Sequence, residues 1–210
     1  MSAPRLLETM RVEGGRVPLL DRHLDRLRAS AAAFGYALDA EAVRRAVAAK
    51  APGAWGLRVT VGEEGGVEVA EVPFLHPLTT AWIDPEPLAE AGTPLCTHKT
   101  TARAHYDARL DRARQRGADE AILVNDGGEV TEGTRTTVWA EAGGRLWTPP
   151  LAAGGLAGVY RAWRLDADPR AAERVLTPDG LRAADAVFLS NALRGWMPVR
   201  LLPSTHPLPT

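Results

Sequence analysis

The stretch "EAILVNDGGEVTEGTRTTVWAEAGGRLWTPP", residues 120–150, decides the fold class. It contains four short strand-like runs, and the turn signals "DGG" and "GG" each separate two of them. Such runs joined by glycine-containing turns are typical of β-hairpins. Residues 120–150 therefore predict two successive hairpins, and with them a sheet in the second half of the chain.

The first half of the sequence mixes helical and strand patterns. Apolar residues recur at helical spacing over 20–34, at Leu20, Leu24, Leu27, Ala31 and Phe34. Asp21 is a possible N-cap of this helix and Gly35 its end, and Asp39 is placed to cap a second helix over 40–50. Strands are predicted at 5–12, 57–61, 66–72 and 78–83, and "VPLL" at 17–20 is read as a further strand or its remnant. This region predicts a small α+β layer.

The segment "DPEPLAEAGTP", residues 84–94, is rich in turn formers and lies near the middle of the chain. Domain boundaries fall in segments of this composition. We therefore expect a small domain at 1–92 and a larger one at 93–210. In the larger one, residues 151–163 predict a glycine-rich loop entering a helix, and residues 185–202 predict two strands around a bend.

Composition excludes some classes of partner. Lys and Arg number 25 against 26 Asp and Glu, so the overall charge suggests neither nucleic acid nor an anionic membrane as a partner. No run approaches the roughly 18 apolar residues that a membrane span needs. The single cysteine, Cys96, cannot form an internal disulfide, which fits a reducing compartment. A cytoplasmic location is the expectation.

Lys99 stands just before an amphipathic helix, in "THKTTARAHYDARLDRARQRG", residues 97–117. A lysine there is ordinarily a solvated charge. A lysine at such a junction could also link covalently to a carbonyl cofactor, provided that its surroundings lower its pKa. Position alone leaves both readings open.

Glu132 lies within the strand predicted at 129–133, where an acidic residue would ordinarily point to water. The functional alternative is a carboxylate paired with a pyridinium nitrogen, which keeps a cofactor ring able to accept electrons. Only a cofactor would require the second role.

Two candidate anion sites are also ambiguous. "GGLAGVY", residues 154–160, lacks the spacing of nucleotide-binding loops, but its glycines and a following helix start could bind phosphate through backbone amides. Arg26 lies off the Leu24/Leu27 stripe and reads as a solvated residue, like Arg22 and Arg28. Its guanidinium is nevertheless well matched to a phosphate dianion.

Five ordered blocks carry a resemblance to a known family. They are "ETMRVEGGRVPLLDRHLDRL" (8–27), "HKTTARAHYD" (98–107), "DEAILVNDGGEVTEGTRTTVW" (119–139), "LWTPPLAAGGLAGVYR" (146–161) and "LSNALRGWMPV" (189–199). They are spread from residue 8 to residue 199 and resemble fold-type IV (class IV) pyridoxal-phosphate enzymes, and the resemblance extends over nearly the whole chain. This family includes branched-chain and D-amino-acid aminotransferases and 4-amino-4-deoxychorismate lyase.

The resemblance implies roles for particular residues. Lys99 would carry pyridoxal 5'-phosphate covalently and act as the catalytic residue, and Glu132 would meet the pyridine nitrogen. The phosphate would be held by Arg26, the Val159 and Tyr160 amides and the Asn191/Ala192 turn, and Leu156 would pack against the ring. It also implies an α+β fold of the D-amino-acid aminotransferase type, with a barrel-like sheet in the larger domain, and a homodimer. No metal is expected.

Within the family, "NALRGWMPV" is more similar to the turn of aminodeoxychorismate lyases than to the "GTA" turn of branched-chain aminotransferases. The resemblance therefore implies a lyase that forms 4-aminobenzoate and pyruvate, a step in folate synthesis. Alternatives are a class IV aminotransferase acting on branched-chain or D-amino acids, and a non-catalytic cofactor-binding module. Family members usually have a further strand before the "ETMRV" block and an Arg- and Gly-rich segment where this chain has "GEEGG". Part of the substrate-facing wall is therefore expected to be missing or rebuilt.

Overall fold

Two β-sheets organise the chain in the computed structural model, which describes residues 3–203. Each sheet belongs to its own unit. The first unit comprises the residues up to 76 together with 98–102 and 192–194, and the second comprises the rest. Because the first unit draws on three separate segments, no single position divides the two units. The predicted boundary at residue 92 is a different division of the chain from these two units, and it stays a prediction.

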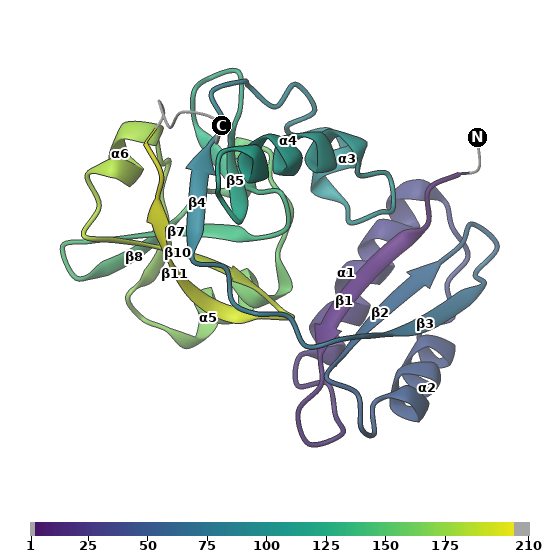
Figure 1. The fold of residues 1–210 in the computed structure, drawn as a ribbon. Helices are drawn as coiled ribbons and strands as arrows, with labels where there is room; N and C mark the ends of the chain where they lie inside the picture. Colours follow the sequence, from purple (N-terminus) through teal and green to yellow (C-terminus); the bar gives the residue numbers. More distant parts are fainter. Residues whose placement is uncertain (1–2, 204–210) are drawn as a thin grey trace. The chain divides into compact units, whose positions relative to one another are not determined.

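The first unit is a three-stranded antiparallel sheet with two helices. The strand order is β1 (Leu6–Arg11), β2 (Gly56–Val61), β3 (Val67–Val72). The helices α1 (Leu20–Phe34) and α2 (Ala40–Lys50) pack on these strands, and one apolar core joins all of these elements. Figure 1 shows these three strands and two helices in purple and blue.

Both helices lie where the apolar spacing predicts them. Gly35 ends α1 in the left-handed conformation, with φ of 70°, and the Asp39 carboxylate caps α2 by accepting the amides of Glu41 and Ala42. The start of α1 differs from the prediction. Its N-cap is Leu19, and Asp21 lies inside the first turn, where a negative charge still complements the helix dipole.

The strand suggested at 17–20 is absent from the described structure. An isolated bridge joins Glu13 and Arg16, and the chain then turns directly into α1. "VPLL" is ambiguous because Leu20 is also the first apolar residue at helical spacing. In the structure Leu20 is the first residue of α1.

The second unit is built on a curled eight-stranded sheet, seen around β10 and β11 in Figure 1. Its strand order is β6-β5-β4-β11-β10-β7-β8-β9. The strands are β4 (Thr80–Ile83), β5 (Glu120–Val124), β6 (Val130–Gly133), β7 (Thr137–Ala142), β8 (Arg145–Thr148), β9 (Ala171–Glu173), β10 (Ala186–Asn191) and β11 (Gly195–Leu201). The predicted hairpins at 120–150 are confirmed as β5–β6 and β7–β8, both antiparallel.

Short helices connect and cover this sheet. They are α3 (Pro94–Thr97), α4 (Ala104–Gln115), the 3-10 turn η1 (Leu151–Ala153), α5 (Val159–Ala167) and α6 (Pro178–Arg182). The helix α4 packs on β5, and α5 packs on β10. The predicted fold class, a small α+β part with a larger part built on a barrel-like sheet, is confirmed. Within residues 3–203, no helix combines the length and apolar character needed to cross a bilayer.

Candidate active site

Lys99 is carried by a short segment that pairs with β1. The Leu7 amide donates to the Lys99 carbonyl at 2.9 Å, and the Thr101 amide donates to the Arg5 carbonyl at 2.9 Å. Leu6 and Thr100 form the antiparallel bridge between these bonds. The backbone of Lys99 is therefore fixed to the edge of the first sheet.

Arg26 reaches the same strand through a buried carboxylate. Because side chains alternate along a strand, Glu8 lies on the same face of β1 as the core residues Leu6 and Met10. This face packs against α1. Arg26 donates from Nε and Nη2 to the two Glu8 oxygens at 2.8 and 2.6 Å, and His23 Nδ1 lies 2.6 Å from Glu8 Oε2. Burial raises the pKa of Glu8, but the Arg26 and His23 charges and hydrogen bonds outweigh it and bring this pKa to about 2.

The reading of Arg26 as an ordinary solvated residue is wrong. Its side chain is 12% exposed, whereas the neighbouring Arg28 side chain is 49% exposed and pairs with Asp25 at the surface. Sequence reasoning missed Glu8 and His23. The available signals were an acidic residue between two core positions of a strand and a histidine at the i−3 position from Arg26.

Two further contacts in the first unit bring the segments around Lys99 and Ala192 to α1 and β1. The Ser30 hydroxyl lies 3.1 Å from His98 Nδ1, which ties the residue before Lys99 to α1. The Ala192 carbonyl accepts the Arg11 amide at 3.2 Å. Arg26, Lys99 and Ala192 therefore all bind to β1, through Glu8, Leu7 and Arg11 respectively.

Glu132 belongs to the second unit and does not point to water. All four residues of β6 are buried, and Glu132 is 8% exposed. The Tyr106 hydroxyl donates to Glu132 Oε1 at 2.5 Å, and the Leu156 amide donates to Oε2 at 3.2 Å. The carboxylate is thus held by one group from α4 and one from the loop before α5.

The loop before α5 approaches β6 closely because it contains glycine. A Cβ on Gly155 would lie 3.2 Å from the Thr131 carbonyl oxygen and 3.4 Å from Glu132 Cβ, which is tighter than most side chains tolerate. The helix α5 then begins at Val159, and none of the side chains within residues 3–203 caps it. The first-turn amides of Val159 and Tyr160 have the character of an anion site.

Asn191 ends β10, the strand on which α5 packs. Its Nδ2 donates to the Arg135 carbonyl, three residues after Glu132, at 3.2 Å. The predicted site residues thus form two groups, each gathered within one unit. The first contains Arg26, Lys99 and Ala192, and the second contains Glu132, Leu156, Val159, Tyr160 and Asn191.

Cys96 has no catalytic character in this environment. It is 1% exposed, and burial raises the pKa of its thiol to about 11. Its Sγ lies 3.8 Å from His105 Nε2, and burial lowers the pKa of that histidine. A protonated buried thiol is a poor nucleophile, and Cys96 packs in an apolar core cluster of the second unit.

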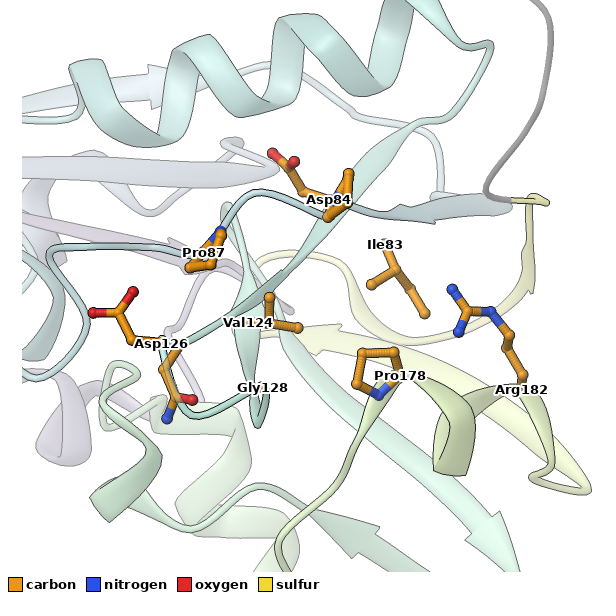
Figure 2. Close-up of a pocket in the computed structure, with 10 residues that line it drawn as sticks. Ile83, Asp84, Pro87, Val124, Asp126, Gly128, Pro178 and Arg182 are labelled. Atoms are coloured by element: carbon orange, nitrogen blue, oxygen red, sulfur yellow. The ribbon is translucent and has the colours of Figure 1, made fainter.

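A cavity of about 320 Å³ lies elsewhere in the second unit, and Figure 2 shows its lining. Ile83 and Val124 from the parallel pair β4 and β5 face Pro178 and Arg182 across it. Among the residues that line it, none is a predicted site residue. Its walls are mainly apolar, and Asp84, its buried acid, is already paired with Arg109 and Arg112 at 3.3 and 2.6 Å.

Comparisons with known proteins identify the family of the chain. A family model described as "Amino-transferase class IV" matches residues 5–202. A Schizosaccharomyces pombe protein, provisionally named aminodeoxychorismate lyase, is 30% identical over 92% of this chain and 88% of its own length. A solved structure from Mesorhizobium loti, provisionally named an amino-acid aminotransferase, is 35% identical with a TM-score of 0.85, covering 95% of this chain and 100% of that one. A PLP-bound hypothetical aminotransferase from Mycobacterium tuberculosis is 26% identical with a TM-score of 0.83, covering 98% and 83%.

Proposed function

Because the chain belongs to the class IV aminotransferase family, whose members depend on pyridoxal phosphate, we propose that it converts 4-amino-4-deoxychorismate to 4-aminobenzoate and pyruvate. The observation that carries this choice is the similarity along 92% of the chain to the S. pombe relative. The lyase-like turn at 191–199 supports it. Since the family is one of enzymes acting on small molecules, a non-catalytic module is set aside.

The residues of the two groups fit pyridoxal phosphate. The phosphate dianion suits the Arg26 guanidinium and the α5 start, which no side chain caps among residues 3–203. A buried, oriented carboxylate at Glu132 suits a protonated ring nitrogen. The proposed binding residues are Arg26, Lys99, Glu132, Leu156, Val159, Tyr160, Asn191 and Ala192.

Each residue would contribute a distinct function. When bound, the cofactor supplies an aldehyde for covalent attachment and a ring that accepts electrons. Lys99 provides the amine for that attachment and, as the catalytic base, removes the proton from the substrate α-carbon. Glu132 accepts a hydrogen bond from the ring nitrogen, and Arg26 holds the phosphate. Loss of pyruvate then leaves the substrate ring aromatic.

The second candidate is amino transfer by a class IV aminotransferase that acts on branched-chain or D-amino acids. The M. loti structure favours it, because that chain is covered completely at 35% identity and carries an aminotransferase name. Both reactions begin with the same proton transfer at the α-carbon. They differ in whether the amino group stays on the cofactor, so substrate assays can separate them.

Assembly and location are part of the same proposal. We expect a homodimer by analogy with the family, and sedimentation as a monomer at micromolar concentration would contradict this. A cytoplasmic location and a role in folate synthesis also stay predictions.

The experiment is a pair of coupled assays on the cofactor-loaded protein. One follows pyruvate and fluorescent 4-aminobenzoate from aminodeoxychorismate, and the other follows amino transfer from L-Leu, L-Glu and D-Ala. We expect lyase turnover to be the faster, and expect it to be lost in Lys99→Ala and kept in Lys50→Ala, the only other lysine. Robust amino transfer without lyase activity would replace the first candidate by the second.

A further inference from the structure

Tyr106 is a buried residue that the proposed chemistry leaves without a role. It lies in α4, where Tyr106, Leu110 and Ala113 form the buried stripe at helical spacing. The side chain is 5% exposed. A buried tyrosine hydroxyl needs a hydrogen-bond partner, and here it donates to Glu132 at 2.5 Å and also contacts the Cys96 thiol.

The Tyr106 ring is fixed on two sides. The Arg103 guanidinium lies over it, 4.9 Å from the ring centroid, and donates to the Thr134 carbonyl at 2.6 Å. The His105 ring lies at 4.2 Å between centroids. These contacts hold the phenol in one place, so its hydrogen bond holds Oε1 of Glu132 in one place too.

The Leu156 amide fixes the second oxygen of Glu132, so the plane of the carboxylate is set from two directions. The phenol and the amide are both neutral donors. Burial, with the nearby Glu132 charge, raises the pKa of Tyr106 far above its usual range, so the phenol keeps its proton. A donor of this kind reduces the basicity of a carboxylate without supplying a charge.

We propose that Tyr106 is a positioning residue that orients Glu132 and weakens its basicity, so that the shared proton stays on the cofactor ring nitrogen. This inference rests on the proposed function, because it assigns Tyr106 a role toward the same bound cofactor. Without the phenol, Glu132 would rotate more freely and compete better for the ring proton. The ring would then be a weaker electron acceptor.

The test compares Tyr106→Phe with the wild type after loading with pyridoxal phosphate labelled with ¹⁵N in the ring. The nitrogen chemical shift distinguishes pyridine from pyridinium without any turnover. We expect a protonated nitrogen in the wild type, a shift toward the unprotonated form in Tyr106→Phe, and about tenfold weaker cofactor binding. The control is Tyr36→Phe, which loses a tyrosine hydrogen bond to the Pro4 carbonyl in the first unit. It should match the wild type.

A double-mutant comparison separates this role from general packing. If Tyr106 acts through Glu132, adding Tyr106→Phe to Glu132→Gln should change cofactor affinity little. A tenfold loss in that background would overturn the inference. If phenylalanine at 106 prevents folding, 4-aminophenylalanine there keeps the volume but is a weaker donor than the phenol, and it should also shift the ring nitrogen toward the unprotonated form. An unchanged nitrogen chemical shift would also overturn the inference.

Failure of this inference is distinguishable from failure of the proposed function. A wild type that does not bind pyridoxal phosphate would overturn both. Wild-type binding with a ring nitrogen unaffected by Tyr106→Phe would overturn the role of Tyr106 alone.

Discussion

Glu8 in the first unit and Glu132 in the second are both buried carboxylates, but they are held by different chemistry. Arg26 and His23 hold Glu8, whereas a phenol and a backbone amide hold Glu132. The first arrangement uses the carboxylate to fix a cation. The second uses a phenol and a backbone amide, both neutral donors, to fix the carboxylate itself, which suits the proposed pairing of Glu132 with a protonated ring nitrogen.

A third buried carboxylate, Glu120 on β5, is not among the predicted site residues. Its oxygens accept from the Thr134 hydroxyl and amide and from the Thr136 hydroxyl, and Arg135 Nε lies 3.5 Å away. Burial raises the pKa of Glu120 despite Arg135. Burial alone therefore does not distinguish a candidate site glutamate from other buried glutamates. The hydrogen-bond donors around each carboxylate have to be compared as well.

The largest effect should come from Glu8→Gln, which breaks the ion pair in the first unit. Removing one partner of a buried pair costs roughly 3 to 5 kcal/mol, which urea denaturation at pH 7 would measure. Glu68→Gln is the matched control, because its pair with Arg5 is at the surface and worth less than about 1 kcal/mol.

The pH dependence of the same variant sharpens the comparison. The pKa of Glu8 is lowered from 4.5 to about 2 in the folded protein, so its contribution is present above pH 4.5 and lost as the pH falls toward 2. The stability gap between the wild type and Glu8→Gln should narrow over that range. A gap that stays constant with pH would argue against an ionised Glu8.

A smaller effect, on cofactor affinity, is expected from Arg26→Lys. This change keeps a positive charge beside Glu8 but removes the planar guanidinium that suits both a carboxylate and a phosphate. Pyridoxal phosphate should bind about ten- to a hundredfold more weakly, as measured by fluorescence titration. Arg28→Lys, at a surface pair, should bind normally, and equal losses in both variants would remove Arg26 from the phosphate site.

The smallest effect is expected from Glu120→Gln. The pKa of Glu120 is raised in the folded protein, so the wild type loses stability as the pH rises above the unfolded pKa of this group. Glutamine does not ionise, so the variant does not lose stability in this way. The variant should be within about 1 kcal/mol of the wild type at pH 7, and its free energy of unfolding should rise relative to that of the wild type as the pH increases from 4.5 toward the raised pKa. A loss as large as that of Glu8→Gln would show that the threonine donors require a charged acceptor.

Local sequence patterns predicted most of the elements. The helices at 20–34 and 40–50 and the hairpins at 120–150 follow from apolar spacing, Gly35, Asp39 and glycine turns, all of which act over a few residues. The strand prediction for "VPLL" was wrong because four residues are too few to show whether the apolar residues recur with the period of a strand or of a helix.

Sequence could not provide the partners of the site residues. The contact of Glu8 with Arg26 depends on how α1 lies on β1, and that of Tyr106 with Glu132 on how α4 lies beside the β5–β6 hairpin. The two residues of each pair are 18 and 26 positions apart in the sequence, respectively, and tertiary packing brings them together. The family resemblance selected Arg26 and Glu132, but it did not identify the groups that hold them.

The most direct test of the central claim uses the small number of lysines. The chain has two, Lys99 on the segment paired with β1 and Lys50 at the exposed end of α2. Borohydride reduction of the protein loaded with pyridoxal phosphate, followed by peptide mapping, would locate the covalent attachment. We expect the reduced cofactor on Lys99 and none on Lys50. Attachment at Lys50 alone, or equally at both lysines, or no adduct at all, would contradict Lys99 as the cofactor-binding residue.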